Sequence, residues 1–293
     1  MTAPLIGFAG LGVMGEPICR NMLQKSGAEV QVFDLSAEPV ERLVALGAKK
    51  SESVAALARE VDILFLSLPG GPQVESVILG KDGVLANGRK GLTVVDMSTA
   101  PVSLTRTIDS KLAERGIDFA DAPVARTRQA AVDGTLSIMV GGSDAVFERI
   151  RPLLAHAATD ITHCGPVGCG QVVKILNNMV LFETVVALSE ALSLGKAAGV
   201  DPDLLFDTMS KGSADSFALR NHGMKAMLKD AFPKGAFPTD YALKDVSYAL
   251  DLAALTGFRA HGAELAQTRM EKARDAGFAQ EYFPVLSRLT DKV

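Results

Sequence analysis

The chain has 293 residues, a formal net charge of −4 and a sequence pI of about 5.7. This length suggests two domains of ordinary size, and the acidic balance excludes the basic surface of a nucleic-acid-binding protein. Its three cysteines and four histidines fit neither a disulfide framework nor a common zinc pattern, so we expect a cytoplasmic protein without a metal site.

Short apolar runs alternate with amphipathic stretches along the first half of the chain. The stretches have helical spacing, so the alternation predicts crossover units and a mainly parallel sheet covered by helices on both faces. We expect strands at Leu5–Ala9, Glu29–Phe33, Ile63–Leu68, Thr93–Val95, Ile117–Ala120, Ser137–Val140 and Asp160–Thr162. Such a sheet binds ligands at the carboxyl ends of its strands.

The second half changes character after Gly165-Pro166-Val167-Gly168, where strand-like runs stop and a helical pattern begins that continues to about Ala198. Further helices are expected from Pro202 and over 216–228, 242–255 and 263–276. The sequence therefore predicts a Rossmann-type, doubly wound α/β domain at residues 1–164. An all-α substrate and oligomerisation domain follows at residues 165–293, and a long helix joins the two.

This long helix is apolar on almost every side between residues 171 and 194, with interruptions at Lys174, Asn177, Asn178, Glu183 and Glu190. The interruptions predict a buried helix rather than a membrane span. A helix that is apolar all round must be covered on most sides, by the other domain or by another subunit. We therefore expect a homodimer or homotetramer with no membrane partner.

The segment Gly10-Leu11-Gly12-Val13-Met14-Gly15 matches the pattern G-x-G-x-x-G, directly after the first expected strand and before a helical stretch. In this context the glycines permit a tight turn and close approach of the backbone to a pyrophosphate. The amino end of the following helix attracts the same group. The alternative is a glycine-rich turn that binds no ligand.

Asp34 ends the second apolar run, about 20 residues past the glycines, where a carboxylate bonds the ribose hydroxyls of a dinucleotide. Neither Leu35 nor Ser36 is an arginine that could take the 2′-phosphate of NADP, so the sequence favours NAD. A turn or helix-capping aspartate is the alternative. Leu68 and Pro69, at the end of the third run, also stand where the cofactor would lie.

Lys174 and Asn178 are four residues apart in the long helix, so they share a face with about 6 Å of rise between them. A lysine on an apolar helix costs desolvation unless it has a partner. An apolar setting also favours the neutral amine that acid–base catalysis uses. A lysine that extends to solvent beside a structural asparagine fits the segment equally well.

Five blocks, in order along the chain, resemble the β-hydroxyacid dehydrogenases, a family that includes 3-hydroxyisobutyrate dehydrogenases and tartronate semialdehyde reductases. The blocks are residues 7–15, Asp96-Met97-Ser98-Thr99, residues 121–124 with 134–136, residues 168–178, and Lys244-Asp245. The resemblance runs from Leu5 to beyond Ala253. It implies an NAD(H)-dependent enzyme that interconverts a small acidic hydroxy compound and its semialdehyde.

The resemblance also implies roles for individual residues. Lys174 matches the catalytic lysine, which protonates the aldehyde oxygen or accepts the hydroxyl proton in the reverse direction. Asn178 and Ser98 match substrate contacts. Four further positions match family residues that lie near the dinucleotide, namely Leu68, Pro69, Thr99 and Lys244. For Ser98 and Thr99, a helix cap before Pro101 is the alternative, and both uses could coexist.

One loop departs from the family pattern. Most members have Ser-Gly-Gly after Pro-Val, whereas this chain has Ala125-Arg126-Thr127, which resembles the sulfolactaldehyde reductase branch. Asp240, four residues before Lys244, also agrees with that branch. An arginine fork binds a carboxylate, sulfonate or phosphate in a bidentate way, so Arg126 and Thr127 are candidate contacts for an acidic substrate group. A solvated loop arginine is the alternative.

Two other functions stay open. A relative that binds the dinucleotide without catalysis would act as a sensor or interaction protein, and imine reductases form another related class. Both usually lack the lysine, so Lys174 argues against them. Sulfolactaldehyde, succinic semialdehyde and methylmalonate semialdehyde all remain candidate substrates.

Overall fold

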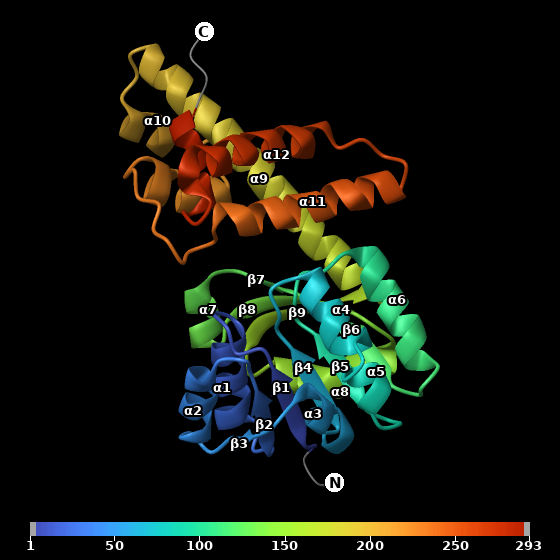
Figure 1. Ribbon diagram of the computed structural model, residues 1–293. Helices are drawn as coiled ribbons and strands as arrows, with labels where there is room; N and C mark the ends of the chain where they lie inside the picture. The colour runs from blue at the N-terminus through green and yellow to red at the C-terminus, as the bar shows by residue number, and fades with distance from the viewer. Residues whose placement is uncertain (1–3, 290–293) are drawn as a thin grey trace. The chain divides into compact units, whose positions relative to one another are not determined.

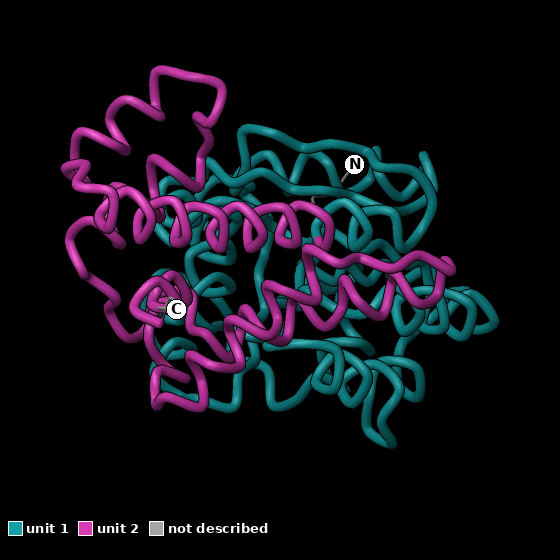
Figure 2. Tube along the Cα trace, turned by 90° about the horizontal axis from the view of Figure 1, so that it is seen from above, with its two compact units in different colours: residues 1–174 teal, residues 175–293 magenta. Residues whose placement is uncertain are grey.

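The computed structural model describes residues 4–289 and divides the chain into two compact units, residues 1–174 and residues 175–293 (Figure 2). The division falls inside the long helix α9 (Cys169–Ala197), after Lys174 rather than after residue 164. Unit 1 holds a mainly parallel sheet with flanking helices, and unit 2 is helical (Figure 1). The predicted fold class is confirmed.

Unit 1 is built on a nine-stranded sheet with the strand order β3-β2-β1-β4-β5-β6-β8-β7 and with β9 paired to β8. Its strands are β1 (Ile6–Ala9), β2 (Val30–Phe33), β3 (Lys49–Lys50), β4 (Ile63–Leu66), β5 (Thr93–Asp96), β6 (Asp118–Asp121), β7 (Val124–Ala125), β8 (Leu136–Gly141) and β9 (Ala158–Gly165). Every expected run forms a strand. Strands β3 and β7 were not predicted, because a strand of two residues is too short for a periodic pattern.

The register of the parallel strands aligns their carboxyl ends. Ala9 pairs with Phe33 on one side and Leu66 on the other, Leu66 pairs with Asp96, and Asp96 pairs with Asp121. Each of these residues is the last of its strand, so the segments that follow leave the sheet from one edge. The strand order reverses between β1 and β4, and such a switch point is where α/β sheets bind ligands.

Helices pack on both faces of this sheet. Successive residues of β4 alternate between two cores, with Ile63 and Phe65 in one and Leu64 and Leu66 in the other. Burial on both faces explains the continuous apolar run of this strand. The helices of unit 1 before α9 are α1 (Gly15–Lys25), α2 (Ala37–Val44), α3 (Val54–Glu60), α4 (Gly71–Leu79), α5 (Val84–Asn87), α6 (Val102–Ala113), α7 (Arg128–Asp133) and α8 (Asp144–Leu154).

Unit 2 consists of helices and their connections (Figure 1). After α9 come α10 (Pro202–Met209), the π-helix η1 (Leu219–Met227), α11 (Thr239–Leu255), α12 (His261–Ala273), the π-helix η2 (Arg274–Phe278) and the 3₁₀-helix η3 (Phe283–Leu289). The one strand-like pairing between residues 175 and 289 is an isolated bridge of Pro238 with Tyr282.

By length and composition alone, α9 could cross a membrane, but core helices of soluble proteins pass the same test. Phe182, Val185 and Leu188 on α9 are buried in the core of unit 2, where they pack with residues of the later helices. This stretch of α9 therefore packs in the core of unit 2, whereas Val173, Leu176 and Val180 of the same helix are exposed.

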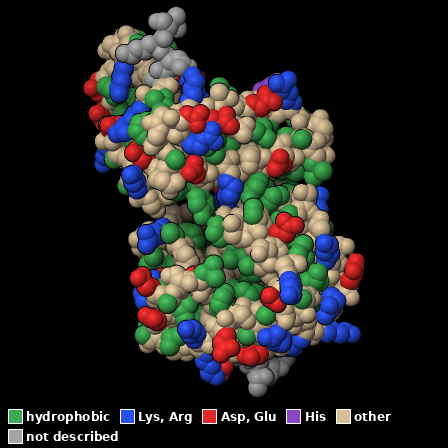
Figure 3. Space-filling model, viewed as in Figure 1, with side chains coloured by type: hydrophobic (Ala, Val, Ile, Leu, Met, Phe, Trp, Pro, Cys, Tyr) green, Lys and Arg blue, Asp and Glu red, His purple; other side chains and the backbone are tan. Residues whose placement is uncertain are grey.

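Charged side chains of both signs are interspersed over the face of the molecule drawn in Figure 3. This distribution agrees with the small net charge of −4. It differs from the single-sign basic stripe that nucleic-acid binding uses.

Aromatic side chains pack in the core of unit 2. The ring of Phe283 lies 5.3 to 5.5 Å, centre to centre, from those of Phe182, Phe237, His222 and Tyr282. His222 is 7% exposed and shares a hydrogen bond between its Nδ1 and the Tyr282 hydroxyl, whereas its Nε2 has no partner among the described residues. Burial lowers the pKa of His222 to about 4.

We expect His222 to reduce stability in acid. The pKa of His222 is lower in the folded chain than the ordinary value of 6.5, because burial disfavours the charged imidazole. Above pH 6.5 the imidazole is neutral in both the folded and the unfolded chain. As the pH falls from 6.5 towards 4, the unfolded chain binds a proton first, so the free energy of unfolding decreases. Between about pH 7 and about pH 4.5, the free energy of unfolding should therefore decrease less in His222→Gln than in the wild type. The difference between the two decreases should be about 2 kcal/mol. Urea unfolding followed by circular dichroism measures this difference, and identical falls would contradict the assignment.

Candidate active site

The glycine-rich loop follows β1 and leads into α1, as expected. Gly10 has a φ of +91°, and a Cβ on it would lie 2.3 Å from the carbonyl oxygen of Ser67, so both conformation and packing require glycine there. A Cβ on Gly12 would meet no atom within 4 Å, and its φ is not positive. The fold does not require glycine at position 12. The open space there fits the close approach of a pyrophosphate.

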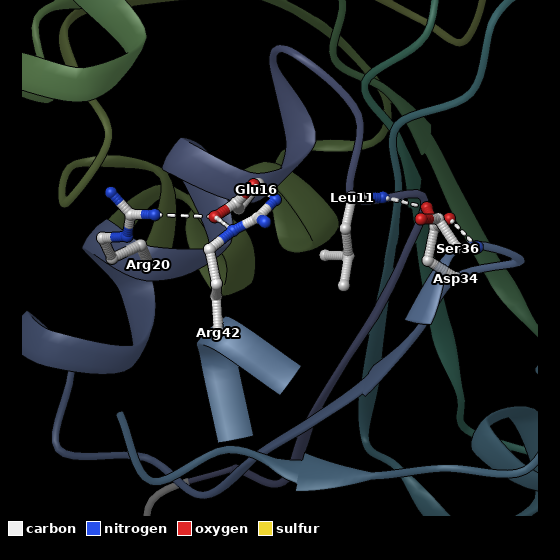
Figure 4. Close-up of polar contacts among 6 residues, drawn as sticks. All are labelled: Leu11, Glu16, Arg20, Asp34, Ser36 and Arg42. Carbon is white, nitrogen blue, oxygen red and sulfur yellow. Dashed lines mark hydrogen bonds and ion pairs between the residues drawn. The ribbon is translucent and has the colours of Figure 1, made fainter. Parts of the chain in front are cut away.

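Asp34 directly follows β2 and faces this loop (Figure 4). One carboxylate oxygen accepts a hydrogen bond of 2.5 Å from the N–H of Leu11, and the other accepts one of 2.7 Å from the N–H of Ser36. The N-cap residue of α2 is Ser36, so Asp34 is not the helix cap. Asp34 supports the turn and reaches the glycine loop, which is where the sequence predicted a ribose-binding carboxylate.

Glu16 joins α1 to α2 beside the loop (Figure 4). Its carboxylate receives two hydrogen bonds of 2.8 Å from the guanidinium group of Arg42 and one of 2.7 Å from that of Arg20. The hydrogen bonds from Arg42, together with the charges of both arginines, hold the pKa of Glu16 below its ordinary value. This ion network ties α2 to the first turn of α1.

Ser98 links the segments that follow β4 and β5. Its hydroxyl oxygen accepts a hydrogen bond of 2.8 Å from the N–H of Leu68, and its own N–H donates one of 3.0 Å to the Asp96 carboxylate. Helix α6 has Pro101 at its N-cap position and no side-chain cap. The reading of Ser98 and Thr99 as caps of this helix is therefore wrong.

Two buried side chains hold the start of α9. The two carboxylate oxygens of Asp121, the last residue of β6, accept hydrogen bonds from the N–H groups of Gly168 and Gln171, both at 2.7 Å. The side chain of Gln171 donates to the carbonyl oxygen of Ser98 at 2.8 Å and accepts from the N–H of Ala100 at 3.2 Å. Burial raises the pKa of Asp121 to about 6, although the two backbone hydrogen bonds act in the opposite direction.

Lys174 lies half-buried in the second turn of α9, and Asn178 follows one turn later. Within unit 2, the amide nitrogen of Asn178 donates a hydrogen bond of 2.8 Å to one oxygen of Asp245. The other oxygen of Asp245 forms an ion pair of 3.0 Å with Lys244. Asp245 therefore brings together Asn178 and Lys244, two residues far apart in the sequence that were predicted to belong to one site.

The structure places the guanidinium group of Arg126 against the β8 and β9 segments. It donates hydrogen bonds to the carbonyl oxygen of Thr135 at 2.6 Å and to the hydroxyl of Thr159 at 2.8 Å, and it pairs with the Asp160 carboxylate at 2.6 Å. Arg126 also has a φ of +85°, which explains the glycine of the family pattern at this position. The hydroxyl of Thr127 caps α7.

No group of three His, Cys, Asp or Glu side chains within residues 4–289 is placed to hold a metal ion. The cysteines Cys19, Cys164 and Cys169 are all reduced and unpaired with one another.

The strand order, the glycine loop and Asp34 together define a dinucleotide-binding fold of the Rossmann type. Residues 5–165 match the NAD-binding domain of 6-phosphogluconate dehydrogenase, and residues 168–287 match the domain described as NAD-binding of NADP-dependent 3-hydroxyisobutyrate dehydrogenase. The chain belongs to the β-hydroxyacid dehydrogenase family, whose members are dehydrogenases of small hydroxy acids and semialdehydes, and its cofactor is NAD.

Individual relatives span nearly the whole chain. The sequence is 42% identical over 246 residues to 2-(hydroxymethyl)glutarate dehydrogenase of Eubacterium barkeri, covering 84% of this chain and 81% of that protein. It is 33% identical over 291 residues to NAD-dependent L-serine dehydrogenase of Pseudomonas aeruginosa, covering 98% and 97%. A solved structure of Mycobacterium tuberculosis 3-hydroxyisobutyrate dehydrogenase with L-serine has a TM-score of 0.89 at 30% identity, covering 98% of this chain and 99% of that one.

Three residues of this region were not assigned a role in the sequence analysis. Asp121, Gln171 and Asp245 are all buried, yet each lies inside a block that carries the family resemblance. A carboxylate or amide within an apolar run was the available signal, since a buried polar group needs a hydrogen-bond partner. The partners themselves come from distant segments, which a local pattern does not identify.

The two loop glycines lead to opposite expectations when each is replaced by alanine. Gly12→Ala should leave the melting temperature unchanged and weaken NADH binding at least about tenfold, because the added methyl group meets only the ligand. Gly10→Ala should instead lower the melting temperature by several degrees, because its Cβ meets the Ser67 carbonyl. Thermal unfolding and NADH fluorescence titration measure both effects. Normal NADH affinity in Gly12→Ala would contradict the pyrophosphate assignment.

Proposed function

We propose that this protein is an NAD-dependent dehydrogenase of a small 3-hydroxy acid, with Lys174 as the catalytic acid and base. The named relatives support this substrate class. The compounds 2-(hydroxymethyl)glutarate, L-serine and 3-hydroxyisobutyrate share a primary hydroxyl group on the carbon next to the carboxylate-bearing carbon. Oxidation of that hydroxyl group gives a semialdehyde, and the reverse reaction reduces it.

The observation that carries the proposal is the position of Lys174. It is a half-buried amine in the second turn of α9, a helix whose start is held at the carboxyl ends of β5 and β6. This sheet edge also carries the glycine loop after β1. A titratable group at the ligand-binding edge of an α/β sheet is a candidate acid or base.

In the proposed reaction, bound NAD supplies the acceptor for the hydride that leaves the hydroxyl-bearing carbon. The amine of Lys174 accepts the hydroxyl proton during oxidation and returns it to the aldehyde oxygen during reduction. One C–H and one O–H bond therefore break as the C=O bond forms. We assign Asn178 to the reacting oxygen and Ser98 to the substrate carboxylate, each through side-chain hydrogen bonds.

We assign the cofactor to the loop residues between Gly10 and Gly15 and to Asp34. The N–H groups of the loop and of the first turn of α1 can bind the pyrophosphate, and the Asp34 carboxylate can accept hydrogen bonds from the ribose hydroxyls. A carboxylate at this position repels a 2′-phosphate, so we propose a preference for NAD over NADP. Leu68, Pro69, Thr99 and Lys244 complete the proposed dinucleotide contacts.

A non-catalytic dinucleotide sensor and an imine reductase are the competing functions. Neither function gives Lys174 a catalytic role. A sensor would bind NADH without reducing any aldehyde, and an imine reductase would act on a C=N bond. The same assays distinguish these functions from the proposed one.

Lys174→Ala should lower kcat for NADH-dependent reduction of a small acidic semialdehyde by about 10² to 10⁴-fold, because the proton donor is lost. NADH binding, followed by fluorescence, should stay within about twofold of the wild type. The matched control is Lys211→Ala, which removes an exposed lysine paired with Asp207 and should change neither quantity. Wild-type turnover in Lys174→Ala, or turnover with NADPH alone, would overturn the proposed chemistry or the proposed cofactor preference, respectively.

We further propose that Arg126 selects a substrate whose acidic group is a sulfonate, as in the sulfolactaldehyde reductase branch, or one that carries a second carboxylate. The group would be a sulfonate or carboxylate that replaces Asp160 as the partner of the guanidinium fork. The exposed ion pair with Asp160 can be exchanged at small cost, since such pairs contribute about 0 to 1 kcal/mol. The alternative is that Arg126 only fastens the loop to β9.

Two variants separate these roles of Arg126. If it binds substrate, Arg126→Ala should raise KM for a sulfonated or dicarboxylic semialdehyde at least about tenfold more than KM for methylmalonate semialdehyde. Asp160→Asn, which removes the competing anion, should leave KM for the sulfonated substrate unchanged or lower. If Arg126 only fastens the loop, both variants will raise KM for every substrate alike.

A further inference from the structure

Helix α9 lacks a side-chain cap from its own sequence. The N–H of Val172 donates a hydrogen bond of 3.0 Å to the carbonyl of Gly168, which makes Gly168 the N-cap residue. Glycine has no side chain to accept from the N–H groups of the first turn. In ordinary helices a serine, threonine, asparagine or aspartate at this position does so.

Asp121 supplies the missing cap from the neighbouring strand β6. One carboxylate oxygen binds the N–H of Gln171, the bond that a local N-cap side chain makes, and the other binds the N–H of Gly168 itself. A single carboxylate therefore performs both halves of a capping box, although it lies 47 residues away along the chain from Gly168. Asp121 is 0% exposed, so water does not compete for these bonds.

The surroundings of this carboxylate are shaped to admit it. A Cβ on Gly141 would lie 2.4 Å from one oxygen of Asp121, and a Cβ on Gly170 would lie 2.8 Å from the other. Both neighbours must lack side chains if the carboxylate is to reach the helix. The side chain of Gln171 adds a second attachment through Ser98 and Ala100, so the first turn is held by the end of β6 and by the segment that follows β5.

We propose that Asp121 is a positioning residue for catalysis, which fixes the start of α9 and thereby the place of the Lys174 amine. Lys174 lies three residues beyond Gln171 on a continuous helix, about 4.5 Å along its axis, so a shift or rotation of the first turn displaces Lys174 directly. Displacement of a catalytic group by about 1 Å can cost about 10²-fold in rate. This inference rests on the proposed role of Lys174.

The test uses Asp121→Asn, which has almost the same shape but presents one acceptor oxygen and one NH₂ group to two N–H donors. We expect kcat for semialdehyde reduction to fall by about 10 to 100-fold, with NADH affinity within about twofold of the wild type. In a Lys174→Ala background, Asp121→Asn should change the residual turnover less than about twofold, because there is no amine left to position. Asp118→Asn, on the same strand but exposed, is the matched control and should behave as the wild type in all assays.

Each outcome has one meaning. Unchanged kcat in Asp121→Asn would overturn the inference, and so would a loss of kcat that is equally large in the Lys174→Ala background. A parallel loss of NADH affinity would also overturn it, because it would show that the whole sheet edge, rather than α9, depends on the carboxylate. Failure of the proposed function is a separate result, since the wild type would then reduce no semialdehyde or Lys174→Ala by itself would keep wild-type turnover.

Discussion

The parallel pairing of β1 with its neighbours is the constraint on which this site depends. Parallel strands in register end at one edge, and the residues aligned there are Phe33, Ala9, Leu66, Asp96 and Asp121. Crossover helices must leave from that edge, so their amino ends gather beside the loops that follow the strands. The glycine loop, Asp34 and the Ser98 segment all follow these aligned residues. The backbone hydrogen bonds between the strands therefore bring residues from distant parts of the chain to one edge of the sheet.

Helix α9 extends this arrangement beyond the sheet. Its start is bound by Asp121 and Gln171, and Lys174 and Asn178 project from its next turns. The two residues lie four positions apart on one helix, so they share a face of it. Burying Asp121 to achieve this carries an electrostatic cost, which is visible in its raised pKa. Two backbone N–H groups at the amino end of a helix offset part of that cost.

The loop that carries Arg126 is held in a strained conformation by side-chain contacts. Arg126 has a positive φ where the family pattern has glycine, and non-glycine residues in such conformations carry about 1 to 3 kcal/mol of strain. Its guanidinium group makes contacts with Thr135, Thr159 and Asp160 that hold the loop in this conformation. An arginine that is kept under strain in this loop is a reason to test it for selection of an acidic substrate group.

The sequence by itself determined the α/β class, the helical second half, the glycine loop and the acidic residue that follows β2. These features depend on local periodicity and on residue types suited to one conformation, so they can be read over short windows. It also distinguished Lys174 and Asn178 as polar residues on an apolar helix, but it did not show that Asn178 meets Asp245 or that Asp121 caps α9. Only the tertiary structure decided those contacts, together with the attachment of Arg126 to Asp160. Each joins residues more than 30 positions apart, and such pairings follow from strand order and helix packing rather than from any local pattern.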